Sequence, residues 1–221
     1  MNFFKKLFSS SEPSINSLKI DTTEWVEEEK TDKEYKWERK DYPAILSINF
    51  FSIPPDLPCH PDHIDNLRNL YRTIAQPDGG IIEVTNILIA GIPSVKTIFK
   101  FPMQPTGMAY IGSITIPFKN YSYVVKIQSW EQGTTGVRDA TIANKMLSEG
   151  TIELGENGIT GWFKDPYDSE IREGIQMNLS ESEEYDSMFP QHPLTFVRTG
   201  LKKIERSICI EKELLQTERF Q

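Results

Sequence analysis

Three side chains that could bind a metal or act as nucleophiles, Cys59, His60 and His63, lie within five positions. Thiolate and imidazole are common zinc ligands. A zinc site needs about four ligands, so Asp62 or His192 would have to supply the fourth. The same groups could serve a metal-dependent or Cys-His hydrolase. However, a helix is predicted to start here and turns the side chains in different directions. We therefore expect no metal site and no catalytic residue, and Cys59, His60 and His63 stay as the weaker alternative.

Sequence motifs of the common enzyme classes are absent from the chain. It has no G-x-S-x-G elbow of a serine hydrolase, no G-x-x-x-x-G-K-[ST] phosphate loop and no dinucleotide fingerprint between a strand and a helix. The stretch 133–136 precedes a predicted helix, so its free N–H groups could bind an anion or be satisfied by ordinary capping. The sequence therefore favours a non-enzymatic protein without a cofactor.

The segment 162–198 alternates aromatic side chains with turn-forming Asp and Pro residues. Such a segment commonly folds back on its own domain, where rings fill a groove and Asp residues cap turns and pair with Arg. Alternatively, the segment forms a recognition surface, because aromatic and arginine side chains are enriched in interfaces. In that interpretation the binding residues are Trp162, Tyr167, Tyr185, His192 and Arg198.

The charge balance excludes some classes of partner. The 221 residues include 24 Lys and Arg against 32 Asp and Glu, which gives a net charge of −8. A nucleic-acid binder needs a basic surface, so we expect no nucleic-acid partner. No window of about 20 residues is continuously apolar, so we expect no integral membrane association. Two cysteines, Cys59 and Cys209, are too few and too far apart for a disulfide framework, and we expect a cytoplasmic protein.

Composition and periodicity divide the chain into an amphipathic leader and linker at 1–22, one domain at 23–210 and a frayed tail at 211–221. An irregular insertion at 150–192 interrupts the domain and carries one short helix near 181–188. Within the domain, the charge-dense stretch 24–41 is expected to form a hairpin whose Trp side chains reach the core, with a charged helix as the alternative.

The remaining elements follow from hydrophobic periodicity. Strands are expected at 44–53, 81–90, 94–101, 108–117 and 121–130. The last four are joined by short connections, and such connections join antiparallel neighbours, so they should form a meander. Helices are expected at 62–75, 136–148 and 193–208. The predicted fold class is α+β: an antiparallel meander sheet packed by about three helices, all on one face.

This order of elements resembles the Mog1/PsbP-like fold group, over roughly residues 24–148 and the last helix. The fold group shares no catalytic residue, so the resemblance implies none here. A second resemblance, to an uncharacterised family of bacterial proteins, rests on short sequence runs. These are Tyr185-Asp186, Phe189-Pro190, His192-Pro193-Leu194 and Arg198, with Leu57-Pro58 after Pro54-Pro55.

Together these observations favour a cytosolic protein-binding protein that acts as a chaperone, adaptor or toxin-neutralising partner of another bacterial protein. Its negative charge would speed association with a basic partner. One alternative is a small-ligand-binding protein with a pocket between the sheet and the insertion, lined by Trp130, Trp162 and Tyr167. The other alternative is the metal-dependent or Cys-His hydrolase considered above.

Overall fold

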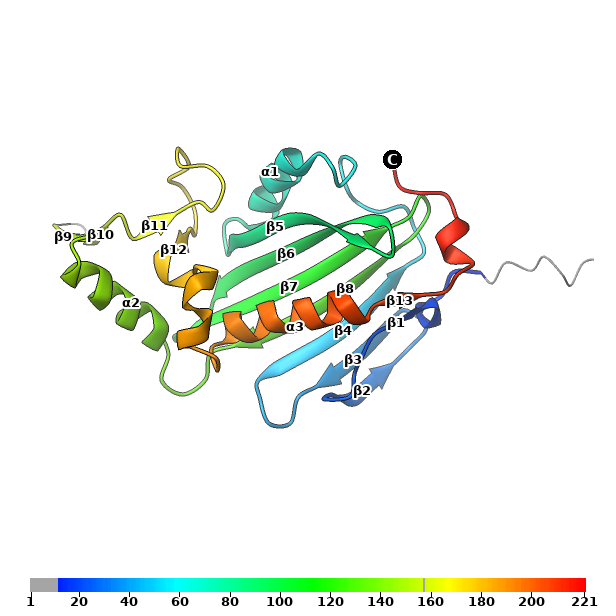
Figure 1. The fold of residues 1–221 in the computed structure, drawn as a ribbon, viewed down its shortest axis with the longest axis horizontal. Helices are drawn as coiled ribbons and strands as arrows, with labels where there is room; N and C mark the ends of the chain where they lie inside the picture. The colour runs from blue at the N-terminus through cyan, green and yellow to red at the C-terminus, as the bar shows by residue number, and fades with distance from the viewer. Residues whose placement is uncertain (1–11, 157) are drawn as a thin grey trace, which may run out of the picture.

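A computed structural model of the chain describes residues 12–156 and 158–221, so residues 1–11 of the expected leader and linker (1–22) lie outside the described part. A seven-stranded antiparallel sheet forms the centre of the molecule (Figure 1). In spatial order its strands are β2 (Val26–Lys30), β3 (Glu34–Glu38), β4 (Ala44–Phe51), β8 (Ser122–Trp130), β7 (Met108–Pro117), β6 (Ile92–Pro102) and β5 (Gly80–Ile89).

Three α-helices and several short elements accompany the sheet. The α-helices are α1 (Ile64–Ala75), α2 (Val137–Ser148) and α3 (Pro193–Ser207). The short strands are β1 (Leu18–Lys19), β9 (Glu153–Gly155), β10 (Gly158–Thr160), β11 (Phe163–Lys164), β12 (Met177–Asn178) and β13 (Cys209–Ile210). The 3₁₀ turns are η2 (Ile15–Ser17), η3 (Leu179–Glu181), η4 (Glu183–Met188) and η5 (Leu214–Gln216). The predicted α+β class is confirmed.

The meander is confirmed as well, because β5, β6, β7 and β8 pair antiparallel in chain order. Its registers separate two faces. Tyr123, Val125 and Ile127 of β8 are fully buried on one face, whereas the alternating Lys126 and Gln128 are only half-buried on the other. The period of two in the sequence therefore corresponds to real burial.

The helices lie on both faces of the sheet, so the expectation of one covered face is wrong. Helix α3 lies against β7 and β8, and a Cβ on Gly112 would stand 2.5 Å from Val197 of that helix. Helix α1 covers the opposite face of β5 and β6, where Leu67 packs against Val84 and Val95. The physical reason is that the strands β5 and β6 carry buried side chains on both faces.

Helix α2 packs mainly away from the sheet. Its buried side chains form a separate cluster with the insertion, which includes Ile142, Met146, Trp162 and Tyr185. The element that α2 contacts most extensively is η3 and not a strand of the sheet. The insertion therefore packs against α2. Near the expected short helix at 181–188 it forms two 3₁₀ turns, η3 and η4.

The hairpin prediction holds for strands β2 and β3. Trp37 is buried in the core at 7% exposure, and Trp25 packs edge-on against Phe196 with ring centroids 6.1 Å apart. The prediction of a frayed tail is wrong. Leu214 is fully buried, and Arg219 forms an isolated antiparallel β-bridge with Phe118. Apolar side chains in the tail cover the sheet end that would otherwise face water.

No helix in the described part of the chain is long and apolar enough to cross a membrane.

Candidate functional site

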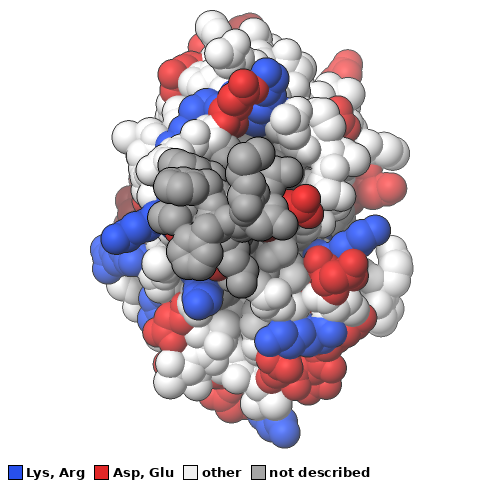
Figure 2. Space-filling model, turned by 90° about the vertical axis from the view of Figure 1, so that its right-hand side faces the viewer, with Lys and Arg blue, Asp and Glu red and all other residues white. Residues whose placement is uncertain are grey.

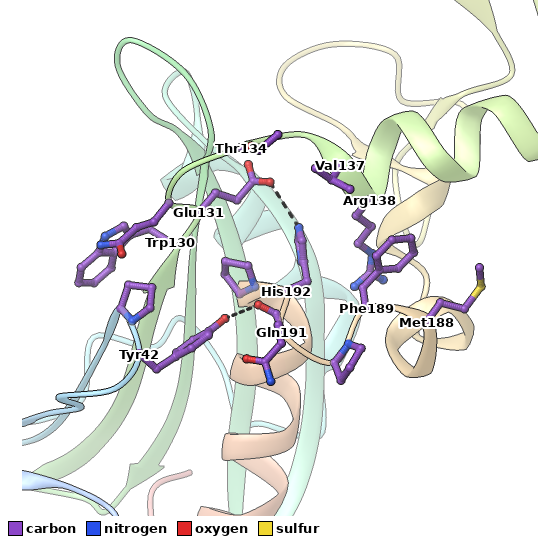
Figure 3. A pocket seen from close by; sticks show the side chains of 14 residues that line it. Tyr42, Trp130, Glu131, Thr134, Val137, Arg138, Met188, Phe189, Gln191 and His192 are labelled. Carbon is purple, nitrogen blue, oxygen red and sulfur yellow. Dashed lines mark hydrogen bonds and ion pairs between the residues drawn. The ribbon is translucent and has the colours of Figure 1, made fainter.

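A cleft of about 410 Å³ opens at one end of the sheet, where three stretches of the chain meet, 42–43, 130–138 and 188–193 (Figure 3). Strand β8 ends there at Trp130, helix α2 begins at Val137, and helix α3 begins at Pro193. The connection between β3 and β4 contributes Tyr42, and the segment before α3 contributes residues 188–192. These segments are far apart in sequence, so only the folded sheet brings them together.

His192 stands in the wall of this cleft, where its ring faces the carboxylate of Glu131 (Figure 3). Its Nδ1 accepts a hydrogen bond from the Leu194 N–H at 3.2 Å, which caps the start of α3. Its Nε2 faces Glu131 Oε1 at 3.7 Å. The ring also stands edge-on to Tyr110, with centroids 5.5 Å apart. His192 thus caps the start of α3 through Nδ1 and presents Nε2 to the Glu131 carboxylate.

Glu131 organises the loop between β8 and α2. Its carboxylate accepts hydrogen bonds from the Met108 N–H at 2.9 Å and the Gly136 N–H at 2.8 Å. Burial raises the pKa of Glu131, but hydrogen bonds from His192 and Gly136 outweigh it and hold this pKa below its ordinary value. At the stretch 133–136, where the sequence suggested an anion site, the Gly136 N–H thus binds the carboxylate of Glu131 from the same chain.

The rest of the lining is mainly apolar. Tyr42 donates a hydrogen bond from its hydroxyl to the Gln191 carbonyl at 2.8 Å and stacks on Phe196 with centroids 4.4 Å apart. Apolar surface continues onto the rim, where Val137 is 49% exposed and Met188 is 52% exposed. The remaining apolar lining residues are Pro43, Trp130, Phe189, Pro190 and Pro193.

A buried polar network fixes the segment beneath the cleft. Glu181, which is fully buried, accepts from Lys100 Nζ at 2.7 Å, from the Tyr110 hydroxyl at 3.0 Å and from the Asn178 N–H at 2.8 Å. Burial first, and then the charge of Glu181, raise the pKa of Tyr110 well above its ordinary value. The carboxylate therefore ties the insertion to strands β6 and β7.

Two arginines extend this network to the cleft. Arg138 and Arg198 each reach Asp186 Oδ1, at 2.9 and 3.0 Å. Arg138 also donates to the Ser180 carbonyl at 2.8 Å, and Arg198 to the Glu181 carbonyl at 2.6 Å. Both guanidinium groups are almost completely buried, so they hold η3 and η4 against α2 and α3.

The structure separates the five predicted binding residues. His192 alone lines the cleft. Trp162 and Tyr185 are buried against α2, and Arg198 is buried in the network. Tyr167 packs near α1, where its hydroxyl accepts from the Val84 N–H at 2.6 Å. These four side chains follow the structural interpretation of the segment, in which rings and Arg198 fill the interior.

The pocket expected between Trp130, Trp162 and Tyr167 does not form. Trp130 lines the cleft, whereas Trp162 and Tyr167 belong to two other clusters. The prediction is wrong because residues 162–178 turn toward β5 and α1 instead of crossing the sheet.

The Cys59–His63 stretch forms local contacts at the start of α1. Cys59 Sγ lies 3.8 Å from the His63 carbonyl, and His60 Nδ1 lies 3.3 Å from Asp62 Oδ2. The helix begins at Ile64, and His63 is the residue at its cap. Within residues 12–156 and 158–221, no three His, Cys, Asp or Glu side chains are grouped as metal ligands.

Sequence reasoning missed most of the cleft. Tyr42, Glu131, Arg138 and Met188 were not singled out as site residues. One signal was present for Glu131, because an acidic residue directly follows a strand and precedes a glycine-rich turn. No comparable local signal marked Tyr42 or Met188.

Comparison with known proteins gives likeness in structure only. No protein-family model matches the chain, and no curated protein matches it. The Ran-binding protein Mog1p of Saccharomyces cerevisiae matches with a TM-score of 0.44 at 9% identity, over 88% of this chain and 90% of that one. A single-residue variant of the protein Mog1 matches with a TM-score of 0.41 at 8% identity, over 90% of this chain and 93% of that one.

A third solved structure, of a protein from Bacteroides thetaiotaomicron VPI-5482, matches with a TM-score of 0.37 at 10% identity. The match covers 55% of this chain and 41% of that one. Two of the three structures are thus Mog1 proteins, members of the fold group that the order of elements resembled.

Proposed function

We propose that this protein is a non-enzymatic binding protein whose cleft receives an extended, apolar segment of a protein partner. One observation carries the proposal: the apolar lining of the cleft continues onto the exposed side chains of Val137 and Met188. Apolar surface that runs from a hollow onto its rim marks an interaction site. Its residue types, Tyr, Trp, Met and Pro, suit a partner chain that lies across it.

The shape of the lining supports an extended partner segment. Grooves lined by aromatic side chains bind extended chains that are already stiff, such as polyproline II segments. Here Tyr42 and Trp130 form one side, and Phe189 lies on the other (Figure 3). Tyr42 is fixed by its hydrogen bond to Gln191 and by stacking, so little side-chain freedom would be lost on binding.

The charge of the chain supports a basic partner. A net charge of −8 attracts cationic proteins over long range and raises their association rate. On the face shown in Figure 2, acidic and basic side chains are interspersed. On that face the attraction would therefore come from the net charge of the molecule rather than from an acidic patch. Both cysteines are free thiols, which supports the proposed cytoplasmic location, where thiols stay reduced.

The finer role we propose is that of a chaperone, adaptor or toxin-neutralising partner, since each of these needs stoichiometric binding without chemistry. Support comes from His192, the one histidine among the cleft residues, whose Nδ1 is used to cap the start of α3. A second candidate function, binding of a small ligand, is favoured by one observation. The cleft volume of about 410 Å³ lies within the range of small-molecule pockets, roughly 300–1,000 Å³.

The test is affinity capture at low salt, followed by titration of the purified captured protein. We expect one basic protein at near equal stoichiometry, bound more weakly as salt rises. Met188→Glu and Val137→Glu should each weaken binding at least about tenfold, because a charge is placed on the apolar rim. Ile53→Glu is the matched control, since Ile53 is 63% exposed but does not line the cleft.

Two outcomes would overturn the proposal. Binding that is equally insensitive to all three substitutions would place the partner elsewhere on the molecule. Absence of any captured protein, together with saturable quenching of the intrinsic Trp fluorescence by a metabolite, would favour the small-ligand function instead.

A further inference from the structure

The two edges of the seven-stranded sheet differ in charge. Edge strand β2 is exposed along its whole length and carries Glu27, Glu28, Glu29 and Lys30. Charged side chains on an edge oppose pairing with another strand. The other edge strand, β5, ends with the uncharged stretch 85–89, Thr-Asn-Ile-Leu-Ile. This half of β5 has no such protection.

The backbone of β5 shows which groups point outward. The Val84 N–H donates to the Tyr167 hydroxyl at 2.6 Å, and the Val84 carbonyl accepts from Arg68 Nε at 3.4 Å. Both groups of Val84 therefore point away from β6. Because the pattern alternates in an antiparallel pair, the N–H and carbonyl groups of Asn86 and Leu88 point outward too. Leu88 also lies opposite Pro93, which has no N–H to offer it.

The open part of this edge has a defined length. At one end, Tyr167 and Arg68 occupy the outward groups of Val84. At the other end β5 stops at Ile89, and the chain turns back at Ala90 and Gly91, both with positive φ. Among residues 12–156 and 158–221, no strand pairs with this edge of β5. The open stretch is therefore five residues long, and its central residue is Ile87.

We propose that the open edge of β5 pairs with the same edge of a second copy of this chain, antiparallel about a two-fold axis at Ile87. In this register Asn86 of each copy lies opposite Leu88 of the other. The two pairs exchange four backbone hydrogen bonds, two N–H and two carbonyl groups coming from each chain. The arrangement is self-complementary, as a two-fold interface requires.

The occupant is a second copy because the two open stretches match. Both consist of the same five uncharged residues, and each is bounded by Tyr167 and Arg68 at one end and by the turn at Ala90 at the other. The outward N–H and carbonyl groups of Asn86 and Leu88 in each copy therefore all find partners. A longer foreign strand would meet the side chains of Tyr167 and Arg68. The pairing also covers Leu88, which is 69% exposed in one chain, and places Ile87 beside its counterpart. None of these residues lines the cleft, so the inference does not depend on the proposed function.

The experiment is sedimentation equilibrium of the full chain over a range of concentrations. We expect the mass to rise from 25.4 kDa toward twice that value as concentration increases. Leu88→Pro should raise the dissociation constant at least about tenfold, because it removes one outward N–H from each copy. It leaves the β5–β6 ladder intact, since that N–H does not point at β6. Leu88→Lys should weaken the dimer similarly, by bringing positive charges near each other.

The control is Leu154→Lys, a substitution at a leucine that is 77% exposed on β9 and should leave the dimer unchanged. Circular dichroism checks that Leu88→Pro and Leu88→Lys remain folded. Two results would overturn the proposal. One is a monomeric mass at concentrations up to about 1 mM. The other is a dimer whose dissociation constant is the same in the wild type and in both Leu88 variants.

Discussion

The buried ion pair of Lys100 and Glu181 gives the sharpest prediction about how the insertion is held on the sheet. The charged atoms lie 2.7 Å apart, and the two side chains are 2% and 0% exposed. At an effective dielectric constant of about 20, unit charges at this separation attract by about 6 kcal/mol. The loss of water from both groups offsets much of this attraction, so the intact pair is worth far less in net stability.

Removing only the cation is costly, because Glu181 would stay buried without a charged partner. It would keep only the Tyr110 hydroxyl and the Asn178 N–H as donors. We predict that Lys100→Met lowers the free energy of unfolding by about 3–5 kcal/mol. For a chain of this length, such a loss corresponds to a fall in Tm of about 10 °C. Adding Glu181→Gln should recover part of the loss, since no buried charge then remains.

The assay is guanidinium unfolding followed by Trp fluorescence, with the slope checked for constancy across variants. Lys145→Met is the matched control, because Lys145 pairs with Glu149 on the surface of α2 with about half of each side chain exposed. The control should lose no more than about 0.5 kcal/mol. A loss below about 1 kcal/mol for Lys100→Met would refute the reasoning, since it would mean that Glu181 is neutralised without Lys100.

Three further predictions concern packing, pH and capping. Gly112→Ala should cost about 1–3 kcal/mol in an unfolding titration, because the new Cβ would lie 2.5 Å from Val197, and an unchanged midpoint would contradict the close packing of α3. Burial raises the pKa of Asp165, but hydrogen bonds from Arg72 outweigh it and leave this pKa below 3.8. The ionised carboxylate thus stabilises the fold above that pH, and this stabilisation is lost as the pH falls through the lowered pKa. Asp165→Asn should therefore lose less stability than wild type when the pH is lowered below about 4. Parallel curves of stability against pH for the two proteins would contradict this role of Asp165. His192→Ala should cost about 1 kcal/mol in thermal unfolding, and His192→Asn should recover most of it because an Asn oxygen also caps a helix; equal losses would show that the ring, not the cap, matters.

Much of the fold was predictable because its elements are specified locally. The alternation in 121–130 and the short connections between strands determine the meander. The spacing of apolar residues in 193–208 determines α3, and Pro193 marks its start. In each case the residues that encode the element are neighbours in the chain, so period and turn chemistry suffice.

What the sequence by itself determined was therefore the main strands and helices, the antiparallel order of the β5–β8 meander and the absence of the common catalytic motifs. Only the tertiary structure decided which face each helix covers, because β5 and β6 are apolar on both sides and suit either. It also decided that Arg198 and Trp162 are interior residues and that Tyr42 and Glu131 share a cleft. The physical reason is that burial and pairing depend on contacts between segments distant in sequence, which local periodicity does not encode.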